Sequence, residues 1–262
     1  MYKLRDWIPE DKLTNCLSSN PRAIEYLKRN PDKINWRTLS ENPEAYELLN
    51  ANKEKIDWFY ASVNPGIIEL IKECPQHKLY WPRLCMNPAA LDLLKDKIDR
   101  IVWFSFCDNT SPQILPILEA NLDKLDKMDW TFLSSNPVAI KLLEANQDKI
   151  GWNGLCFNPE AIHIIERNLD KVCWLALSSN PSAIHILEKN FDKIGWKYLS
   201  GNPAAIHLLQ QNKEKIDWSN LSKNPAIFEY DYKAMSRPFF EELMANRFHP
   251  TNINRFEDWG FE

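Results

Sequence analysis

Apolar and polar positions recur along the chain with a period of about 22 residues. The pattern is clearest at 136–152, which reads N-P-V-A-I-K-L-L-E-A-N-Q-D-K-I-G-W. A degraded copy begins at Asn109, where a two-residue insertion places the proline at Pro112. A fixed period of this length predicts an array of stacked repeats. The intact Asn-Pro pairs begin at Asn20, Asn42, Asn64, Asn87, Asn136, Asn158, Asn180, Asn202 and Asn224.

Each unit is predicted to contain two short helices, and the first begins at the Asn-Pro step. Asparagine is a favoured N-cap, and proline suits the first helical position because its missing N–H is not needed there. In one copy Ala205, Ile206 and Leu209 share a face at helical spacing. We expect this helix to end at a second asparagine, in the left-handed conformation that this residue tolerates. These residues are Asn30, Asn52, Asn121, Asn146, Asn168, Asn190 and Asn212.

The second helix carries a tryptophan and, three residues later, a leucine, as at Trp196 and Leu199. Neither helix is long enough to be stable alone, so the stacking of neighbouring units must supply the burial. A buried indole removes about 150–250 Å² from water, so the tryptophans are predicted to form the structural core of the repeats. They are Trp36, Trp58, Trp81, Trp103, Trp130, Trp152, Trp174, Trp196 and Trp218.

These features predict an all-α protein, an α-solenoid of two-helix 22-residue repeats with N- and C-terminal caps. Residues 1–19 are interpreted as the N-terminal cap, 20–225 as an array of about nine to ten units, and 226–262 as an aromatic-rich C-terminal cap. The irregular unit around 109–130 is 27 residues long, and a kink or a projecting loop is expected there. The alternative is a leucine-rich-repeat-like horseshoe, against which the missing L-x-L motif and the proline after asparagine argue.

Composition narrows the class of protein. The chain has a net charge of −4, with 26% charged residues of both signs, so no bulk field favours nucleic acid or an anionic membrane. No apolar run approaches the ~20 residues needed to cross a bilayer, and residues 1–7 lack the apolar stretch of a signal peptide. The six cysteines include no C-x-x-C pair, so neither zinc nor a disulfide framework is indicated. We expect an intracellular protein that is not secreted and has no membrane association.

One surface column of the array is basic. Lysine or arginine stands three residues before each of the nine repeat tryptophans, and the candidate surface residues are Lys149, Lys171 and Lys193 in the regular units. Such a column could follow the phosphates of a nucleic acid. The preceding residue is acidic in eight of the nine copies, as at Asp148 and Asp170. Ion pairing between the two columns is the favoured interpretation, which makes nucleic-acid binding the alternative function.

A second candidate column contains His163, His185 and His207, one repeat apart. With neighbouring units about 10 Å apart, these imidazoles are too far from one another to share a metal with Zn–N bonds of about 2.0–2.1 Å. An acidic residue follows two of them by three positions, as Glu166 follows His163. Helical i,i+3 pairing is therefore expected for this column, with no metal site.

The consensus W-x-x-L-S-x-N-P-x-A-I-x-L-L-x-x-N-x-D-K-I resembles the tandem repeats of giant DNA virus proteins. A closing segment similar to 230–262 follows the array in some of those proteins. The resemblance covers nearly the whole chain and implies a viral protein in the infected host cytoplasm or the virion. The family has no established chemistry or site residues.

No repeat contains a nucleophile–base pair, a glycine-rich phosphate loop or a pair of catalytic acids. We therefore expect no catalytic residues, no cofactor and no enzymatic activity. An extended repeat surface favours a scaffold or adaptor that binds a protein partner.

Overall fold

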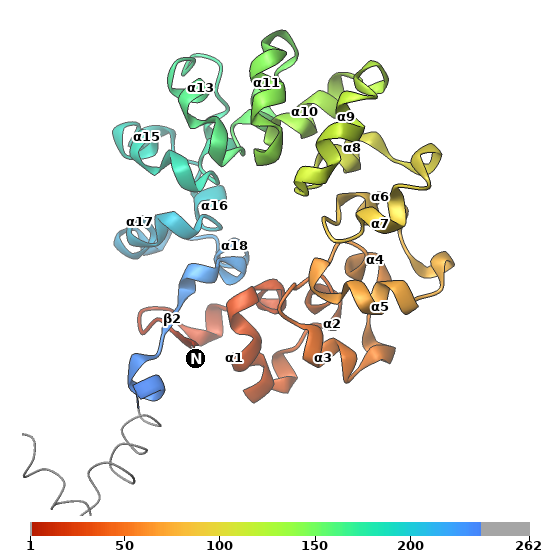
Figure 1. The fold of residues 1–262 in the computed structure, drawn as a ribbon. Coiled ribbons are helices and arrows are strands. Elements are labelled where there is room, and N and C mark those ends of the chain that lie inside the picture. The colour runs from red at the N-terminus through yellow and green to blue at the C-terminus, as the bar shows by residue number, and fades with distance from the viewer. Residues whose placement is uncertain (1, 237–262) are drawn as a thin grey trace, which may run out of the picture.

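The structure is a computed structural model. It describes residues 2–236, and residue 1 and residues 237–262 lie outside the described range. The described residues form short helices in a regular repeating pattern and two three-residue strands (Figure 1). The predicted fold class, all-α, is confirmed. A strand in every unit, as in the alternative horseshoe, is not found within residues 2–236.

Each regular unit contributes one α-helix to the outer side of the array and one to its inner side (Figure 1). The outer helices follow the Asn-Pro step, whereas most inner helices begin at the tryptophan. The outer helices are α1 (Ile24–Arg29), α3 (Tyr46–Asn50), α5 (Ile68–Glu73), α7 (Leu91–Leu94), α9 (Leu115–Glu119), α11 (Ile140–Ala145), α13 (Ile162–Glu166), α15 (Ile184–Lys189) and α17 (Ile206–Gln211). The inner helices are α2 (Trp36–Leu39), α4 (Trp58–Ala61), α6 (Trp81–Met86), α8 (Trp103–Cys107), α10 (Lys127–Ser135), α12 (Trp152–Leu155), α14 (Trp174–Leu177), α16 (Trp196–Leu199) and α18 (Trp218–Lys223).

Single 3-10 turns connect these helices. One set begins at the proline of the Asn-Pro step or its equivalent: Pro21–Ala23, Pro65–Ile67, Pro112–Ile114, Pro137–Ala139, Pro159–Ala161, Pro181–Ala183, Pro203–Ala205 and Pro225–Ile227. A second set links each outer helix to the next inner one: Pro31–Lys33, Lys53–Lys55, Gln76–Lys78, Ile98–Arg100, Leu122–Lys124, Gln147–Lys149, Phe191–Lys193 and Lys213–Lys215. Near the N-terminus lie Glu10–Lys12 and Asn15–Ser19.

The second recurring asparagine does not take the left-handed conformation expected for it. Asn146 has φ −131° and ψ 52°, and Asn190 has φ −130° and ψ 51°. The Nδ2 group of each donates instead to the carbonyl four residues earlier, Leu142 O and Ile186 O, at 2.9 Å. Because this bond satisfies a carbonyl at the helix end, the chain can pass directly into a 3-10 turn without a positive φ.

The fully buried core consists of leucine, isoleucine and alanine, with the tryptophans around it. Leu177, Leu199 and Ala205 are completely buried. Most of the repeat tryptophans are half-buried and pack against this core, whereas Trp130 is buried, with 4% exposure. The indoles therefore lie at the edge of the core, and the aliphatic side chains fill its centre.

A ladder of asparagine side chains runs through this core. We call ten residues the ladder asparagines: Asn20, Asn42, Asn64, Asn87, Asn109, Asn136, Asn158, Asn180, Asn202 and Asn224. Each is buried, and each Nδ2 donates to two backbone carbonyls of the neighbouring unit at 2.7–3.1 Å. Each Oδ1 accepts the N–H two residues on. In seven units this bond caps the 3-10 turn that begins at the proline, as predicted for an N-cap. One amide thus starts its own unit and bonds it to the preceding one around the array.

A buried serine adds a second bond across most joints. Ser178 Oγ donates to the Trp174 carbonyl at 2.7 Å and accepts the Gly195 N–H of the next unit at 2.9 Å. In another copy the sulfur of Cys156 accepts the Cys173 N–H at 3.3 Å. Cysteine therefore replaces serine in this column as an acceptor as well as a small buried side chain.

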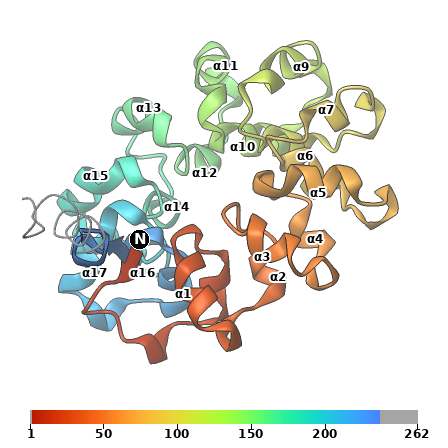
Figure 2. The same ribbon diagram turned by 60° about the horizontal axis from the view of Figure 1, so that its bottom comes forward.

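The array closes into a ring of ten units. Asn20 donates to the carbonyls of Ser222 and Asn224, which belong to the last unit, at 3.0 and 2.9 Å. The N–H of Thr14 donates to Ser222 Oγ at 3.0 Å, as the Gly195 N–H donates to Ser178 Oγ at an ordinary joint. These bonds repeat the ladder without a break, so each joint accounts on average for one tenth of a full turn. Figures 1 and 2 show the first and last units side by side.

We call the joint between the first and last units the seam. A two-stranded ribbon reinforces it. Strand β1 (Tyr2–Leu4) pairs antiparallel with β2 (Phe228–Tyr230), and Tyr2 lies opposite Tyr230. Arg5 donates through Nε to the Ala226 carbonyl at 2.7 Å and contacts Glu229 at 2.8 Å. The ribbon occupies the place in the tenth unit where the other units have an outer α-helix.

The seam differs from the expected picture of two capped ends. A terminal cap would expose one face to water, but the described part of segment 1–19 contacts the last unit through Thr14 and the first through Ser18. A closed ring leaves no end face to cover, because each terminal unit buries the other. Most of the expected C-terminal cap, residues 237–262, lies outside the described range.

The 27-residue unit contains a longer inner helix at the place where a kink or projecting loop was expected. Helix α10 begins three residues before Trp130, at a capping box formed by Asp126 and Asp129. Asn109 keeps its ladder bonds to Cys85 O and Asn87 O. The extra residues are thus absorbed without interrupting the ladder.

Candidate interaction surface

The charged groups of the basic column lie over the indole rings of the repeat tryptophans. In regular units the ammonium group sits over the indole of the preceding unit, with 4.9 Å from Lys149 to Trp130 and 4.4 Å from Lys193 to Trp174. The same arrangement joins Lys55 to Trp36, Arg100 to Trp81, Lys171 to Trp152 and Lys215 to Trp196. A cation over an indole face is worth about 0.5–1 kcal/mol at an exposed site. The column therefore covers the half-buried indoles and links neighbouring units.

The expected ion pairing between the basic and acidic columns is not what the structure shows. Among residues 2–236 no salt bridge joins Lys149, Lys171 or Lys193 to an acid, the nearest chain neighbours Asp148, Asp170 and Asp192 included. The lysine stems point over the preceding unit, whereas an adjacent residue in a 3-10 turn projects in another direction. Both columns remain exposed to solvent.

The histidine column pairs with glutamates of the preceding unit. His163 Nε2 lies 2.9 Å from Glu144, and His185 Nε2 lies 2.8 Å from Glu166. His207 repeats this contact with Glu188 at 3.1 Å. The expected i,i+3 pairing within one helix is therefore wrong for these residues, and the pairs connect successive outer helices. Within residues 2–236 no group of three potential ligands could hold a metal ion.

The buried thiols are poor nucleophiles. Burial raises the pKa of the Cys107 thiol to about 12, and it also raises the pKa values of Cys85 and Cys156. The thiolate is the reactive form of cysteine, so these groups are chemically inert at neutral pH. Their role is structural, as small buried side chains at the joints between units.

Two carboxyl groups in the long unit have unusual surroundings. Burial raises the pKa of Asp108 and of Asp129 above the ordinary range of the residue. Ser135 Oγ donates to Asp108 at 3.5 Å, and Asp129 accepts the Asp126 N–H at 2.8 Å. The contact of Asp129 belongs to the cap of α10, and that of Asp108 holds two inner helices together.

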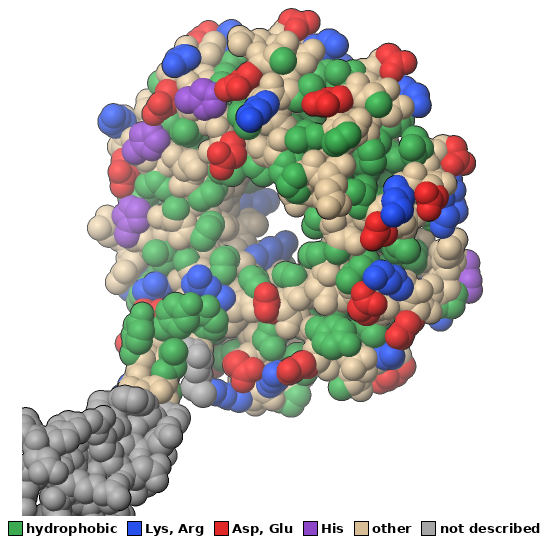
Figure 3. Space-filling view, in the orientation of Figure 1, with side chains coloured by type: hydrophobic (Ala, Val, Ile, Leu, Met, Phe, Trp, Pro, Cys, Tyr) green, Lys and Arg blue, Asp and Glu red, His purple; other side chains and the backbone are tan. Residues whose placement is uncertain are grey.

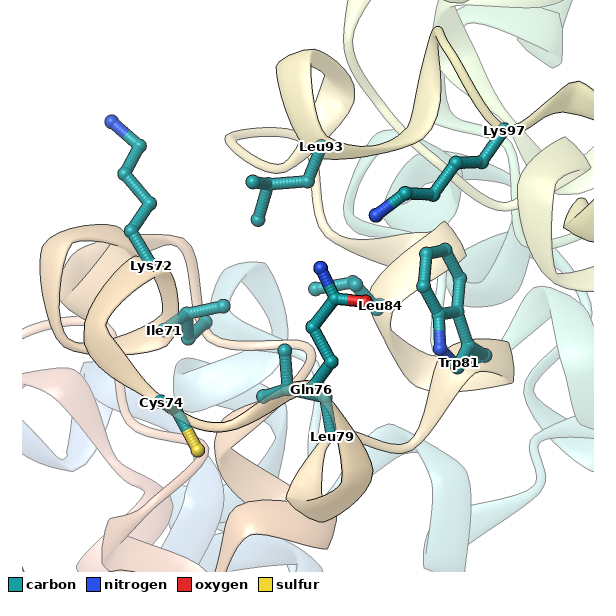
Figure 4. A pocket seen from close by; sticks show the side chains of 9 residues that line it. All are labelled: Ile71, Lys72, Cys74, Gln76, Leu79, Trp81, Leu84, Leu93 and Lys97. Carbon is teal, nitrogen blue, oxygen red and sulfur yellow. The ribbon is translucent and has the colours of Figure 1, made fainter.

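One cavity between neighbouring units is small. Figure 4 shows one between two neighbouring units, with the indole of Trp81 at one side and the side chains of Gln76 and Lys97 directed toward it. Its volume is about 40 Å³, which is room for little more than a water molecule. The remaining lining residues are Ile71, Lys72, Cys74, Leu79, Leu84 and Leu93.

The ring surrounds a central opening, visible in the space-filling view of Figure 3. The inner helices border this opening in Figure 1. On each of them the residues three and four after the tryptophan point into the core, so the residues one, two and five after it lie on the opposite side. The exposed and half-buried residues at these positions include twelve that we call the inner rim: Arg37, Glu41, Phe59, Tyr60, Arg83, Phe104, Phe132, Phe157, Leu175, Lys197, Tyr198 and Lys223.

The inner rim is rich in aromatic side chains that remain exposed. Phe59 and Phe104 are each 41% exposed, and Tyr198 is 42% exposed. Large apolar side chains gathered on a surface that the protein does not itself cover are typical of interaction sites. The repeat motif gave no signal for these residues because they differ from unit to unit.

Part of the rim is organised by arginine. The guanidinium of Arg83 lies 5.0 Å from the ring of Phe59 and 4.9 Å from that of Tyr60, and it contacts Glu41 at 3.0 Å. Arg37 lies over Tyr60 at 4.8 Å. Arg83 and Glu41 belong to units two places apart, and such a contact is possible on the concave side of a curved array. Side chains from three successive units thus hold the aromatic pair of the middle unit in place.

Comparison of the chain with protein-family models, with curated proteins and with solved structures finds no match. No helix among the described residues is long and apolar enough to cross a membrane. The geometry of the ring therefore carries the functional argument.

Proposed function

We propose that the protein is a non-enzymatic scaffold or adaptor, an α-solenoid closed on itself, that mediates protein–protein interaction through its inner rim. The repeated residues are already engaged inside the ring. The ladder asparagines bond neighbouring units, the leucines fill the core, and the lysines cover the indoles. The residues that vary between units are the ones free to recognise a partner.

The observation that carries this proposal is the exposed aromatic surface of the rim. Protein-binding surfaces are enriched in tyrosine, phenylalanine and arginine and depleted in lysine and glutamate. Phe59, Tyr60 and Arg83 form such a group, with Arg37 beside them. A closed ring also holds its surface rigidly, which lowers the entropic cost of ordering it on binding.

A pull-down from cell lysate with the tagged full-length chain tests the proposal. The expected result is a protein captured by the native chain, with and without nuclease treatment, and lost when Phe59 and Phe104 are both replaced by serine. Capture that depends on nucleic acid would contradict it. The double variant must keep the helical circular dichroism of the native chain for the comparison to hold.

The second candidate is a nucleic-acid-binding solenoid that uses the lysine and arginine column. It is favoured by one observation, the exposure of Lys149, Lys171 and Lys193 without an acidic partner within residues 2–236. Binding through this column would weaken steeply with salt. A titration with DNA and RNA across salt concentrations, repeated with the three lysines changed to glutamate, separates the two candidates.

We infer a place of action from the resemblance of the repeat to those of giant DNA viruses. The protein would then work inside an infected cell, in the host cytoplasm or the virion. Antibody detection in fractionated infected cells and purified virions tests this inference.

A further inference from the structure

The inner rim has a charge opposite to that of the whole chain. The sequence contains 36 acidic and 32 basic residues, yet Arg37, Lys197 and Lys223 lie on the rim with Arg83. The half-buried Glu41 pairs with Arg83 at 3.0 Å, and Arg37 lies 3.9 Å from Asp57. Asp108 lies at the position equivalent to that of Glu41, where burial raises its pKa. Basic residues at these positions (Arg37, Arg83, Lys197 and Lys223) therefore outnumber acidic ones (Glu41 and Asp108) on a molecule that is acidic overall.

The rim also repeats its apolar groups around the ring. Phe59 and Phe104 belong to one half of the array, whereas Leu175, 54% exposed, and Tyr198 belong to the other. Lys197 precedes Tyr198, and Arg83 stacks on Phe59, so cations and apolar side chains alternate. A partner that satisfies both must present carboxylates and aromatic or large apolar side chains along one stretch.

The closed ring restricts the shape of this partner. The seam bonds leave no open end through which a folded surface could slide along the inner helices. An extended segment or a protruding loop can enter the opening from either side. The residues around it come from many units, so such a segment would contact several units at once.

We propose that the inner rim binds an extended acidic segment of a partner protein that carries aromatic side chains. This inference rests on the proposed scaffold function and adds the chemistry of the partner. A protein segment is favoured over single-stranded nucleic acid because the rim offers only a few cations, and each neutralised phosphate requires one. Aromatic and arginine residues at the centre of an interface contribute most of the binding free energy.

The probe for this proposal is a fluorescent random copolymer of glutamate and tyrosine in a 4:1 ratio. We expect it to raise the fluorescence anisotropy on addition of the full-length protein. The matching lysine–tyrosine copolymer and a 20-residue oligothymidylate are expected not to bind. Preference for either of these over the acidic copolymer, or no binding of the acidic copolymer, would overturn the proposal.

Matched variants locate the binding surface. Phe59→Ser should weaken binding of the acidic copolymer about 10-fold, the size of one substantial contact. Tyr46→Ser removes an equally exposed ring, 42% against 41%, from outer helix α3 and should leave binding unchanged. Equal losses in the two variants would place the binding site elsewhere.

A second pair of variants tests the charged residues and leaves the aromatic side chains unchanged. The double change of Lys197 and Lys223 to glutamate should weaken binding at least 10-fold, whereas Lys141→Glu with Lys189→Glu on outer helices should not. Both pairs change the net charge equally. If a protein partner is still captured from lysate while all rim variants bind the copolymer like the native chain, the rim proposal fails and the scaffold function stands.

Discussion

The seam and an ordinary joint use the same contacts but differ in how the chain connects them. At the joint between the Asn180 and Asn202 units, Asn202 donates to the carbonyls of Ser178 and Asn180, both at 3.0 Å. At the seam Asn20 does the same with the last unit at 3.0 and 2.9 Å. At the ordinary joint the two units are also linked by the continuous polypeptide chain, whereas non-covalent contacts alone hold the seam.

The difference explains why the seam has additional parts. Closing a long chain costs entropy that grows slowly with its length, and the contacts at the seam must offset this loss. The ribbon of β1 and β2, the contact of Arg5 with Glu229 and the donation by Arg22 to the Phe228 carbonyl have no counterpart at the ordinary joint. Repetition alone thus builds nine joints, and sequence outside the repeats completes the tenth.

The largest expected effect tests whether the seam packs as tightly as the ordinary joint. Leu199→Ala should lower the free energy of unfolding by about 2–5 kcal/mol, the usual loss for a buried leucine. Leu17→Ala, at the seam, should lower it by a similar amount, because Leu17 is only 2% exposed. Equilibrium denaturation in urea measures both.

The control for this pair is Leu175→Ala, since that side chain is 54% exposed. Its loss should stay within about 0.5 kcal/mol, as for most surface substitutions. A loss below about 1 kcal/mol at Leu17 alone would mean that the seam lies outside the cooperative core.

The next effect concerns the ladder. Asn202→Ala removes an N-cap, worth about 1 kcal/mol, and leaves two buried carbonyls without a donor, so a loss of about 2–4 kcal/mol is expected. Asn20→Ala should instead act mainly on local opening, because no chain connection holds the seam together. Hydrogen exchange should show faster exchange at Leu4 and Phe228 in Asn20→Ala than in Asn202→Ala. Equal protection in both variants would contradict a separately opening seam.

A smaller effect compares the cation–indole contacts. A double-mutant cycle on Trp174 and Lys193, 4.4 Å apart, should give a coupling of about 0.5–1 kcal/mol. At the seam Lys213 lies 5.7 Å from Trp7, so its coupling should be weaker. The cycle uses alanine at each position and urea denaturation, and a stronger coupling at the seam would reverse the ranking.

Much of each unit could be predicted from the sequence because it depends on local rules. The N-cap role of the ladder asparagines follows from the Asn-Pro step, and the inner helix begins near its tryptophan in nearly every copy. Closure could not be predicted, because it depends on the angle between units, which no single repeat encodes. Asn20 looked like any other cap until its donation to Ser222 and Asn224 was seen.

The surface columns show the same limit. Lys193 and Asp192 are neighbours in sequence, which favoured an ion pair, but the lysine contacts Trp174 in the preceding unit. Contacts between units depend on the register of stacking, and His185 pairs with Glu166 for the same reason. The rim residues gave no sequence signal at all, because variation within a repeat column carries no pattern.

The smallest effect is a pH dependence at the seam. A hydrogen bond with Tyr230, at 3.3 Å between the hydroxyl oxygens, raises the pKa of Tyr2, and burial adds to the shift. A hydrogen bond with Glu229 raises the pKa of Lys3. Both groups favour their protonated forms when the seam is closed, so their contribution is complete below the ordinary pKa values and is lost as pH rises through the raised ones. NMR of ¹³Cζ-labelled tyrosine should show that Tyr2 titrates at a higher pH in the native chain than in Tyr230→Phe. Identical titration in the two chains would mean that the hydroxyl contact does not contribute to closing the ring.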